Sequence, residues 1–281
     1  MHDIAADERD GQPVWRVADG TDLVPGISAI ERIAVGTSCE TWLGWSRALW
    51  CPTLVKLGRP GRPPRSLTRE VTALTGTVHP ALPRLFGADL AAGIPWIATE
   101  FVVGTALDEL PAIDVGLAAL VTVDLLAAVR DLHRRGLAHL DVKPENVLIR
   151  DGRPVLVDFG SARPLGRRQP AGRPVGTPGF ASPELEAGDP IAAEMDVFGI
   201  GATVLAALAA APYAETTCSA VDVTSARPDL AADAGARALV DRLAAMTGPA
   251  GARPFVDAAL LAVADLFDPS CRPWPAGLTP A

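Results

Sequence analysis

The pattern of apolar residues changes once along this chain, close to Gly104. Before that point, short apolar segments rich in β-branched and aromatic residues alternate with turns, a pattern typical of strands. These segments are SAIERIAV, ETWLGW, TLVKL, PRLFGADL and PWIATEF. After that point, apolar residues recur at helical spacing, first at Leu117, Val121, Leu125, Val129 and Leu132. The sequence therefore predicts an α+β protein in which a small strand-rich part precedes a larger helical part.

One helix is expected inside the strand-rich part. A loop rich in Pro, Gly and Arg, LGRPGRPPRS, leads into the segment SLTREVTALTGTV. In that segment Leu67, Val71 and Leu74 recur at helical spacing. Ser66 stands where a side-chain oxygen caps the first turn of a helix. The predicted helix therefore lies between the third and the fourth predicted strand.

The chain has 281 residues, of which 49% are hydrophobic, enough for one large domain or two lobes that share a cleft. Residues 1–27 are a polar extension with scattered Pro and Gly, and the final DPSCRPWPAGLTPA favours an irregular tail. We therefore expect an extension at residues 1–27, a domain at 28–267 and a tail at 268–281. Within the domain we expect an N-terminal part at 28–99, a connector at 100–104 and a C-terminal part at 105–267.

Charge and composition exclude several classes of protein. Basic residues number 25 and acidic residues 33, so the net charge is −8 and neither nucleic acid nor an anionic membrane is an expected partner. The initial MHDIAADERD does not resemble a signal peptide, and the apolar run VFGIGATVLAALAAAP is too short for a bilayer, so it predicts a buried helix. The four cysteines lack metal-binding spacing, which favours free thiols and a cytoplasmic location.

Lysine and asparagine are rare in this chain. It contains two lysines, Lys56 and Lys143, and one asparagine, Asn146, whereas arginines number 25 − 2 = 23. Lysine is a compact ammonium where arginine is a wide planar fork, and asparagine offers a neutral oxygen ligand. We expect such rare residues to stand where Arg or Asp would fail. The alternative is that codon bias makes Lys and Asn rare and leaves the remaining ones at random positions. The positions of the three residues decide between these two explanations.

The segment HLDVKPENVL occupies residues 139–148, and VDFG occupies residues 157–160. An acid, a lysine and an amide therefore lie close together, and a second acid follows. In phosphoryl transfer, one carboxylate orients the attacking hydroxyl, while another carboxylate and a neutral oxygen hold Mg²⁺. A lysine neutralises charge on the moving phosphoryl group. Phosphoryl transfer is therefore the chemistry that this set of residues favours.

These two segments resemble the catalytic loop and the DFG motif of eukaryotic-type (bacterial-style) Ser/Thr protein kinases, in a variant with HLD in place of HRD. The resemblance implies a two-lobed protein-kinase-like fold, with a β-rich N-lobe that carries one helix and a larger helical C-lobe. It implies that Asp141 is the catalytic base and that Lys143 contacts the γ-phosphate. The implied cofactors are ATP and Mg²⁺, with Asn146 and Asp158 as the metal ligands.

Other motifs of this family follow in order along the chain. Lys56, in LVK, matches the strand lysine that holds the α- and β-phosphates, and Glu70 matches the helix glutamate that pairs with it. Thr177, in GTPGFASPE, matches the residue that contacts the catalytic loop in Ser/Thr kinases. Asp196, in DVFGIG, matches the helix aspartate that supports the backbone of that loop. The resemblance thus covers roughly residues 28–267.

The resemblance also implies a nucleotide site. Thr99 matches the gatekeeper residue, and Glu100 and Val102 match hinge residues whose backbone groups bond the adenine. Gly36 matches the glycine of the Gly-rich loop that lies nearest the phosphates. The residues expected to bind ATP are Ile33, Gly36, Thr41, Leu54, Lys56, Thr99, Glu100, Val102 and Leu148.

Three features depart from the family pattern. The Gly-rich loop, ERIAVGTSCETWLG, has Ala34 and Cys39 at glycine positions and keeps only Gly36, so it cradles phosphates less closely. Leu54 replaces the usual alanine above the adenine and is expected to crowd the base. Leu140 replaces the arginine of the HRD motif.

Three functions follow from these observations. The first is a Ser/Thr protein kinase that transfers the γ-phosphate of Mg-ATP to a protein hydroxyl, which the intact Lys56, Asp141, Asn146 and Asp158 favour. The second is a pseudokinase that acts as a binding or scaffold module. The third is a small-molecule phosphotransferase, which usually lacks a segment such as GTPGFASPE. Expected partners are ATP, a Ser/Thr protein substrate and an unidentified regulatory partner, without nucleic acid or membrane.

The loop between VDFG and GTPGFASPE bears on regulation. It contains no Ser, Thr or Tyr between Ser161 and Thr177. Leu140 also removes the cation that a loop phosphate neutralises in many kinases. We therefore expect catalytic activity that does not require phosphorylation of this loop. Its four arginines either attract an acidic substrate or partner or form a solvated loop; they are Arg163, Arg167, Arg168 and Arg173.

Overall fold

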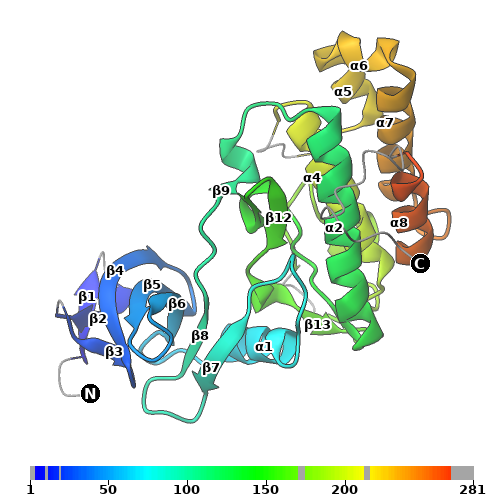
Figure 1. Ribbon diagram of the computed structural model, residues 1–281. Helices are drawn as coiled ribbons and strands as arrows, with labels where there is room; N and C mark the ends of the chain where they lie inside the picture. The colour runs from blue at the N-terminus through cyan, green and yellow to red at the C-terminus, as the bar shows by residue number, and fades with distance from the viewer. Residues whose placement is uncertain (1–3, 10–11, 19, 170–174, 212–215, 267–281) are drawn as a thin grey trace, which may run out of the picture.

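The computed structural model describes residues 4–9, 12–18, 20–169, 175–211 and 216–266. A strand-rich part and a helical part are joined by an extended connector (Figure 1). The strand-rich part contains a six-stranded antiparallel sheet in the order β3-β4-β5-β6-β8-β7. Its strands are β3 (Asp22–Val24), β4 (Ile27–Val35), β5 (Cys39–Ser46), β6 (Cys51–Gly58), β7 (Leu85–Asp89) and β8 (Trp96–Glu100). The five predicted strands and the two-lobed α+β class are confirmed.

The register of this sheet separates two faces. Residues directly opposite one another in an antiparallel pair lie on the same face. Thr41 lies opposite Lys56, and Leu54 lies opposite both Leu43 and Thr99. The other face carries a small apolar core formed by Leu23, Val24, Ile27, Trp42, Val55, Leu57 and Ala98. The face that carries Lys56 is therefore the one available for a site.

Three strands precede residue 28, where the sequence predicts only a polar extension. β1 (Ile4–Arg9) and β2 (Gln12–Val17) form an antiparallel hairpin, and β3 joins the main sheet beside β4. Val14, Leu23 and Val24 are buried. The apolar residues in this region stand in runs of at most three among polar residues, and no strand periodicity is visible in the sequence. Their burial comes from packing against the sheet.

The predicted helix in the strand-rich part is α1 (Arg65–Leu74). It buries Leu67, Glu70, Ala73 and Leu74. The predicted cap is wrong, because the residue at the N-cap is Pro64 and no side chain accepts a hydrogen bond there. The Ser66 hydroxyl instead lies 2.7 Å from the hydroxyl of Ser38 in the turn before β5.

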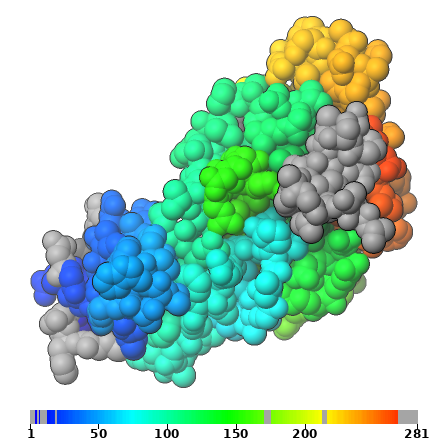
Figure 2. All heavy atoms as spheres, in the orientation of Figure 1, coloured from blue at the N-terminus to red at the C-terminus, as the bar shows by residue number. Residues whose placement is uncertain are grey.

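The helical part is organised around α2 (Val115–Arg134), the predicted long helix. Its apolar side packs against α4 (Glu194–Leu208), α7 (Ala234–Met246) and α8 (Val256–Ala264). The shorter helices are α3 (Pro183–Glu186), α5 (Ala220–Ala226) and α6 (Pro228–Ala232). The molecule is elongated, with the strand-rich part at one end and α5 and α6 at the other (Figure 2).

Helix α4 is the apolar run that the sequence predicts to be buried. All but the first of its 15 residues are buried, which confirms the prediction. Gly201 permits close packing here, because a Cβ added to it would lie 2.9 Å from the Cβ of Met246 on α7. Within the described parts of the chain, no helix is both long enough and apolar enough to cross a membrane.

Two small sheets hold the catalytic-loop segment against the VDFG segment. β11 (Val147–Arg150) pairs with β12 (Arg153–Leu156) and with β9 (Thr105–Ala106). β10 (Leu137–Ala138) pairs with β13 (Arg163–Pro164). Residues 139–146 and 157–162 therefore leave these sheets side by side.

Three of the four cysteines fall within the described residues. Cys39, Cys51 and Cys218 are free thiols there, as the sequence predicts. Cys271, Arg173 and the predicted irregular tail at residues 268–281 lie outside the described residues.

Candidate functional site

Lys56, Glu70 and Asp158 come together from three separate elements. Lys56 lies on β6, Glu70 lies on α1, and Asp158 follows β12. The Lys56 Nζ atom lies 2.8 Å from Glu70 Oε2 and 3.2 Å from Asp158 Oδ1. Lys56 and Glu70 are buried, whereas the Asp158 side chain is 52% exposed. The arrangement fixes an ammonium beside a carboxylate that still faces solvent.

Charge interactions set the ionisation of this group. Burial alone lowers the pKa of Lys56, but the carboxylates of Glu70 and Asp158 outweigh it and raise the pKa above its ordinary value. Burial raises the pKa of Asp158, but the charge and hydrogen bond of Lys56 bring it below its ordinary value. Burial raises the pKa of Glu70 against the opposing effect of Lys56. At neutral pH the site therefore presents a charged Lys56 and an ionised Asp158.

Asp196, near the start of α4, holds the backbone of the catalytic-loop segment through hydrogen bonds. Asp196 Oδ2 accepts a 2.8 Å hydrogen bond from the backbone N–H of His139, and Oδ1 accepts one of 2.7 Å from that of Leu140. His133 Nε2 lies 2.9 Å from Asp196 Oδ2. Leu140 has a φ of 68°, a left-handed conformation that costs roughly 1–2 kcal/mol for a non-glycine residue. The hydrogen bond to Asp196 holds this strained turn in place.

Asp141 is fixed by its neighbours on both sides. Thr177 Oγ1 donates a 2.8 Å hydrogen bond to Asp141 Oδ1, and Asn146 Nδ2 donates one of 2.9 Å to the Asp141 backbone oxygen. His139 Nδ1 accepts from the Asp141 N–H at 3.3 Å, and its Nε2 donates to the Val157 carbonyl at 3.2 Å. The amide nitrogen of Asn146 is thus committed to Asp141. Among the described residues, no donor contacts the Asn146 amide oxygen, which stays available as a ligand.

Lys143 follows Asp141 by two residues in the HLDVKPENVL segment. Its Nζ atom forms a 2.7 Å ion pair with Glu145 Oε2. Burial lowers the pKa of Lys143, but Glu145, Asp141 and Asp158 together raise it above its ordinary value. Lys143 is therefore a charged, ion-paired ammonium on the segment that the two small sheets hold beside VDFG.

The sheet supplies several of the residues predicted to bind a nucleotide. Thr41, Leu54 and Thr99 share the sheet face of Lys56. Ile33, near the end of β4, is 49% exposed. Leu54 is half-buried, so this face offers a partly exposed apolar surface next to Lys56.

The connector contributes the remaining predicted residues. The Glu100 side chain binds Arg150 at 2.5 Å and Arg84 at 3.7 Å, and its backbone N–H donates to the Arg84 carbonyl at 2.8 Å. Val102 is buried within the connector. Leu148 lies on β11, opposite Ala106 of β9. The Glu100 N–H is therefore already hydrogen-bonded to Arg84, so an adenine would have to bind other backbone groups of the connector.

One residue that the sequence did not single out contacts the degenerate Gly-rich loop. Arg59 follows β6 and is buried. Its Nη1 donates a 2.8 Å hydrogen bond to the carbonyl of Gly36. Its Nε and Nη2 donate to the carbonyl of Pro13, in the N-terminal hairpin, at 3.0 and 2.8 Å. Arg59 therefore ties the loop glycine to a segment that precedes the sheet.

A second set of hydrogen bonds attaches the same hairpin. The Trp15 N–H donates to Glu40 Oε1 at 2.6 Å, and Trp15 Nε1 donates to the Gly58 carbonyl at 2.7 Å. Arg32 Nη1 lies 3.2 Å from Glu40 Oε2, so the fully buried Glu40 carboxylate is paired. The two Trp15 contacts and the Arg59–Pro13 hydrogen bonds join residues 25 to 46 positions apart. No local sequence pattern signals them, although a buried acid in a strand is an unusual feature.

Comparisons with known proteins agree with this geometry. Residues 56–230 match the family described as "Protein kinase domain". The chain is 35% identical over 156 residues to the serine/threonine-protein kinase AfsK of Streptomyces griseus, covering 52% of this chain and 19% of that protein. It is 39% identical over 126 residues to the serine/threonine-protein kinase PknK of Mycobacterium tuberculosis, covering 42% and 11%. The chain thus spans about a fifth or less of these relatives.

Solved structures show the same fold. The crystal structure of the PknI kinase domain of Mycobacterium tuberculosis superimposes with a TM-score of 0.68 at 22% identity, covering 90% of this chain and all of that one. That likeness concerns the fold, whereas the family match covers well over half of the sequence and includes the site residues from Lys56 to Asp196. The chain therefore belongs to the protein kinase domain family.

Proposed function

We propose that this protein is an ATP-dependent Ser/Thr protein kinase that transfers the γ-phosphate of Mg-ATP to a hydroxyl of a protein substrate. The observation that carries the proposal is the Lys56–Glu70–Asp158 group together with the fixed carboxylate of Asp141, two residues before Lys143. Phosphoryl transfer depends on positioning and charge stabilisation, and these side chains supply both. The names of the AfsK and PknK relatives favour Ser and Thr as the acceptors.

In this proposal Asp141 receives the substrate hydroxyl. Its Oδ1 is engaged by Thr177 and its backbone oxygen by Asn146, so its orientation is defined before a substrate arrives. A carboxylate held in this way orients the hydroxyl and accepts its proton as the phosphorus–oxygen bond forms. Lys143, which lies in the field of Asp141, neutralises the charge that builds on the transferred group.

The available oxygens fit a magnesium ion. Mg²⁺ binds carboxylate and amide oxygens and retains several waters. Asp158 offers an ionised, half-exposed carboxylate, and Asn146 offers an amide oxygen that no described donor contacts. When bound, the ion would neutralise charge on the phosphates. Lys56 would bind the α- and β-phosphates, and Leu54 and Thr99 would contact the adenine from the sheet.

The decisive experiment is a [γ-³²P]ATP assay of the purified protein, alone and with a generic basic protein as acceptor. We expect phosphoserine or phosphothreonine in the products and its loss in an Asp141→Asn variant. Phosphate incorporation that persists in Asp141→Asn would indicate a contaminating kinase. If the wild-type protein binds Mg-ATP without transfer, the pseudokinase function holds. Transfer only to small molecules would instead indicate the third class of function.

Arg59 is predicted to support the nucleotide loop. Replacing Arg59 by alanine removes the donor to the Gly36 carbonyl and is expected to raise the KM for ATP roughly tenfold or more, since a hydrogen bond from a charged group contributes about 1.5–3 kcal/mol. We expect kcat to change less, because the Arg59 hydrogen bonds to Gly36 and Pro13 fix the loop of the strand-rich part and not the Asp141 segment. Initial rates at varied ATP give both constants. Arg62→Ala, an exposed arginine in the same loop, is the matched control. A lowered kcat at unchanged KM would contradict the prediction.

Activity is predicted not to require phosphorylation of the activation segment. Thr177 is already bonded to Asp141, and Leu140 provides no cation for a loop phosphate. The protein is treated with phosphatase, shown by mass spectrometry to be unmodified over residues 158–184, and assayed. We expect the activity to be retained. Loss of activity that returns after phosphorylation of Ser161 or Thr177 would contradict this prediction.

A further inference from the structure

The N-terminal hairpin of β1 and β2 packs against the face of the main sheet opposite the one that carries Lys56. Figure 1 shows the two strands beside β4. Val14 is buried, and Trp15 and Val17 pack against the small apolar core of that face. Among the described strands, β2 pairs with β1 alone, so its second edge has no neighbouring strand. Because unpaired backbone groups are unfavourable where they are buried, other groups must satisfy this edge.

Three charged side chains take the place of a neighbouring strand along this edge. The Trp15 N–H donates to Glu40 Oε1 at 2.6 Å, and the Trp15 carbonyl accepts from Arg32 Nη1 at 3.1 Å. Two residues earlier, the Pro13 carbonyl accepts from Nε and Nη2 of Arg59 at 3.0 and 2.8 Å. Alternate residues of a strand direct their backbone groups to the same edge, so these contacts form one row. The row comes from β4, β5 and the residue after β6.

Glu40 is the centre of this row and is fully buried. Besides the Trp15 N–H, its carboxylate accepts from Arg32 Nη1 at 3.2 Å and from Trp42 Nε1 at 3.3 Å. A buried carboxylate is unfavourable unless it is both paired and hydrogen-bonded. One of its three donors belongs to the hairpin, so separation of the hairpin from the sheet would leave Glu40 incompletely satisfied. The buried acid therefore favours the packed position of the hairpin.

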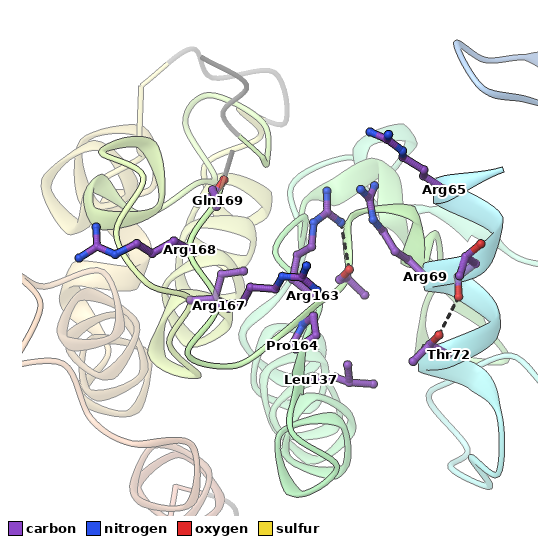
Figure 3. Close-up of a pocket in the computed structure, with 12 residues that line it drawn as sticks. Arg65, Arg69, Thr72, Leu137, Arg163, Pro164, Arg167, Arg168 and Gln169 are labelled. Carbon is purple, nitrogen blue, oxygen red and sulfur yellow. Dashed lines mark hydrogen bonds between the residues drawn. The ribbon is translucent and has the colours of Figure 1, made fainter. Parts of the chain in front are cut away.

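The row differs from the other arginine contacts of this arginine-rich chain. Arg65, Arg167 and Arg168, which line the pocket drawn in Figure 3, are all exposed. Arg59, in contrast, is 4% exposed, and Arg32 lies over the ring of Trp42 at 5.1 Å from its centroid. The contacts of the hairpin thus belong to the interior, where loss of a partner has a large effect.

The same row is attached to the Gly-rich loop. The Gly36 N–H donates to the Cys39 carbonyl at 2.9 Å to form the turn, and Arg59 Nη1 donates to the Gly36 carbonyl at 2.8 Å. Glu40 directly follows this turn on β5. Because side chains alternate along a strand, Glu40 faces the hairpin while the next residue, Thr41, lies on the predicted nucleotide face. One short strand segment therefore connects the hairpin to the nucleotide face.

We propose that the N-terminal hairpin holds the Gly-rich loop in its binding conformation, and that Glu40 is the positioning residue through which the hairpin sets the affinity for nucleotide. The loop keeps only Gly36, with Ala34 and Cys39 at the other glycine positions, and so cradles phosphates less closely. A loop that is ordered before binding loses less entropy when the ligand binds. The hairpin supplies this order from the opposite face of the sheet. The inference rests on the nucleotide site of the proposed function.

The test is the affinity for Mg-ADP, measured by isothermal titration calorimetry with the full chain, because ADP binding requires no phosphotransfer. Glu40→Ala should weaken binding by about fivefold or more, as expected for coupling between two sites. Glu40→Gln keeps an acceptor for the Trp15 N–H and should lie between the wild type and Glu40→Ala. Arg47→Gln, which removes an exposed ion pair with Asp22 on the same sheet, is the matched control and should not change the affinity.

A variant of the hairpin itself is the second measurement, because Glu40→Ala leaves buried donors unpaired and lowers stability. Trp15→Phe keeps the aromatic packing and removes only the Nε1 donor to the Gly58 carbonyl at 2.7 Å. Its affinity for Mg-ADP should also fall. Thermal melting identifies the variants that are folded at the titration temperature, and Trp15→Phe decides alone if Glu40→Ala is unfolded. Unchanged affinity in the folded variants would overturn the proposal.

Initial rates distinguish positioning from a purely structural role. Glu40→Gln should raise the KM for ATP more than it lowers kcat, because the loss concerns nucleotide binding. A lower kcat at unchanged KM, as expected from a loss of folded protein, would overturn the proposal. Wild-type protein that does not bind Mg-ADP would overturn it together with the proposed function. Weaker Mg-ADP binding in the Glu40 and Trp15 variants of a protein that transfers no phosphate would support this inference and refute phosphotransfer.

Discussion

Replacing Asp158 by alanine is expected to abolish phosphotransfer while leaving the protein folded. Asp158 is the half-exposed carboxylate that contacts Lys56 and, in the proposed function, holds Mg²⁺. Loss of an electrostatic group of this kind costs several kcal/mol of transition-state stabilisation, so the rate should fall roughly a thousandfold or more. The fold should survive because Lys56 keeps its buried partner Glu70 at 2.8 Å. The [γ-³²P]ATP assay gives the rate, and thermal melting gives the stability.

Nucleotide binding provides a second measurement of the same change. Wild-type protein should show a rise in melting temperature with ATP that depends on Mg²⁺, since a ligand that binds only the folded state stabilises it. Asp158→Ala should lose the dependence on Mg²⁺, whereas Asp241→Ala, an exposed acid on α7, should keep it. Near-normal activity of a folded Asp158→Ala protein would remove Asp158 from the proposed metal site.

The residues proposed for phosphotransfer in the 139–148 segment could be singled out from the sequence because they are close together along the chain. Asp141, Lys143 and Asn146 lie within one short segment, and the scarcity of Lys and Asn in this chain marks them further. The alternation of short apolar segments with turns likewise predicted the five strands from residue 28 onward, each of which the structure contains. The Lys56–Glu70 pair joins two elements, so its prediction depended on resemblance to a family and not on spacing alone.

The N-terminal strands and the Arg59 contacts were not predictable in the same way. β1 and β2 contain no run of alternating apolar residues, and they are ordered by the sheet against which they pack. Arg59 lies in a loop rich in Pro and Gly, where an arginine is usually exposed. Here it is buried and donates hydrogen bonds to two carbonyls from distant segments. Such contacts depend on tertiary structure, and a local pattern carries no information about them.

Among single substitutions near the site, Asp196→Ala is expected to cause the largest decrease in the free energy of unfolding. Its side chain is fully buried and accepts hydrogen bonds from the backbone of His139 and Leu140 and from His133. Asp196→Ala leaves two buried backbone N–H groups and a buried histidine without their acceptor. Each such group costs about 1–3 kcal/mol, and breaking a buried charged network costs about 3–5 kcal/mol. The urea concentration at the midpoint of unfolding should therefore be lower for Asp196→Ala than for the wild type.

The same change should also reduce activity, for a reason that concerns Leu140. Its left-handed conformation, with a φ of 68°, is unfavourable for leucine and is held by the hydrogen bond to Asp196. Without that bond the loop can relax, and Asp141, the next residue, would lose its orientation toward Thr177. Asp196→Asn keeps one acceptor oxygen and should lie between the wild type and Asp196→Ala in both stability and activity.

The pH dependence of stability distinguishes the contribution of the Asp196 charge from that of its hydrogen-bonding shape, which asparagine largely keeps. Burial raises its pKa, but the hydrogen bond and charge of His133, together with the backbone N–H groups, bring it below the ordinary value of 3.8. A depressed pKa stabilises the folded state above pH 3.8, and this stabilisation is lost as the pH falls through the folded pKa. The stability difference between wild type and Asp196→Asn should therefore shrink as the pH falls below 4. Urea midpoints across this range test it, and a difference that grows on acidification would contradict it.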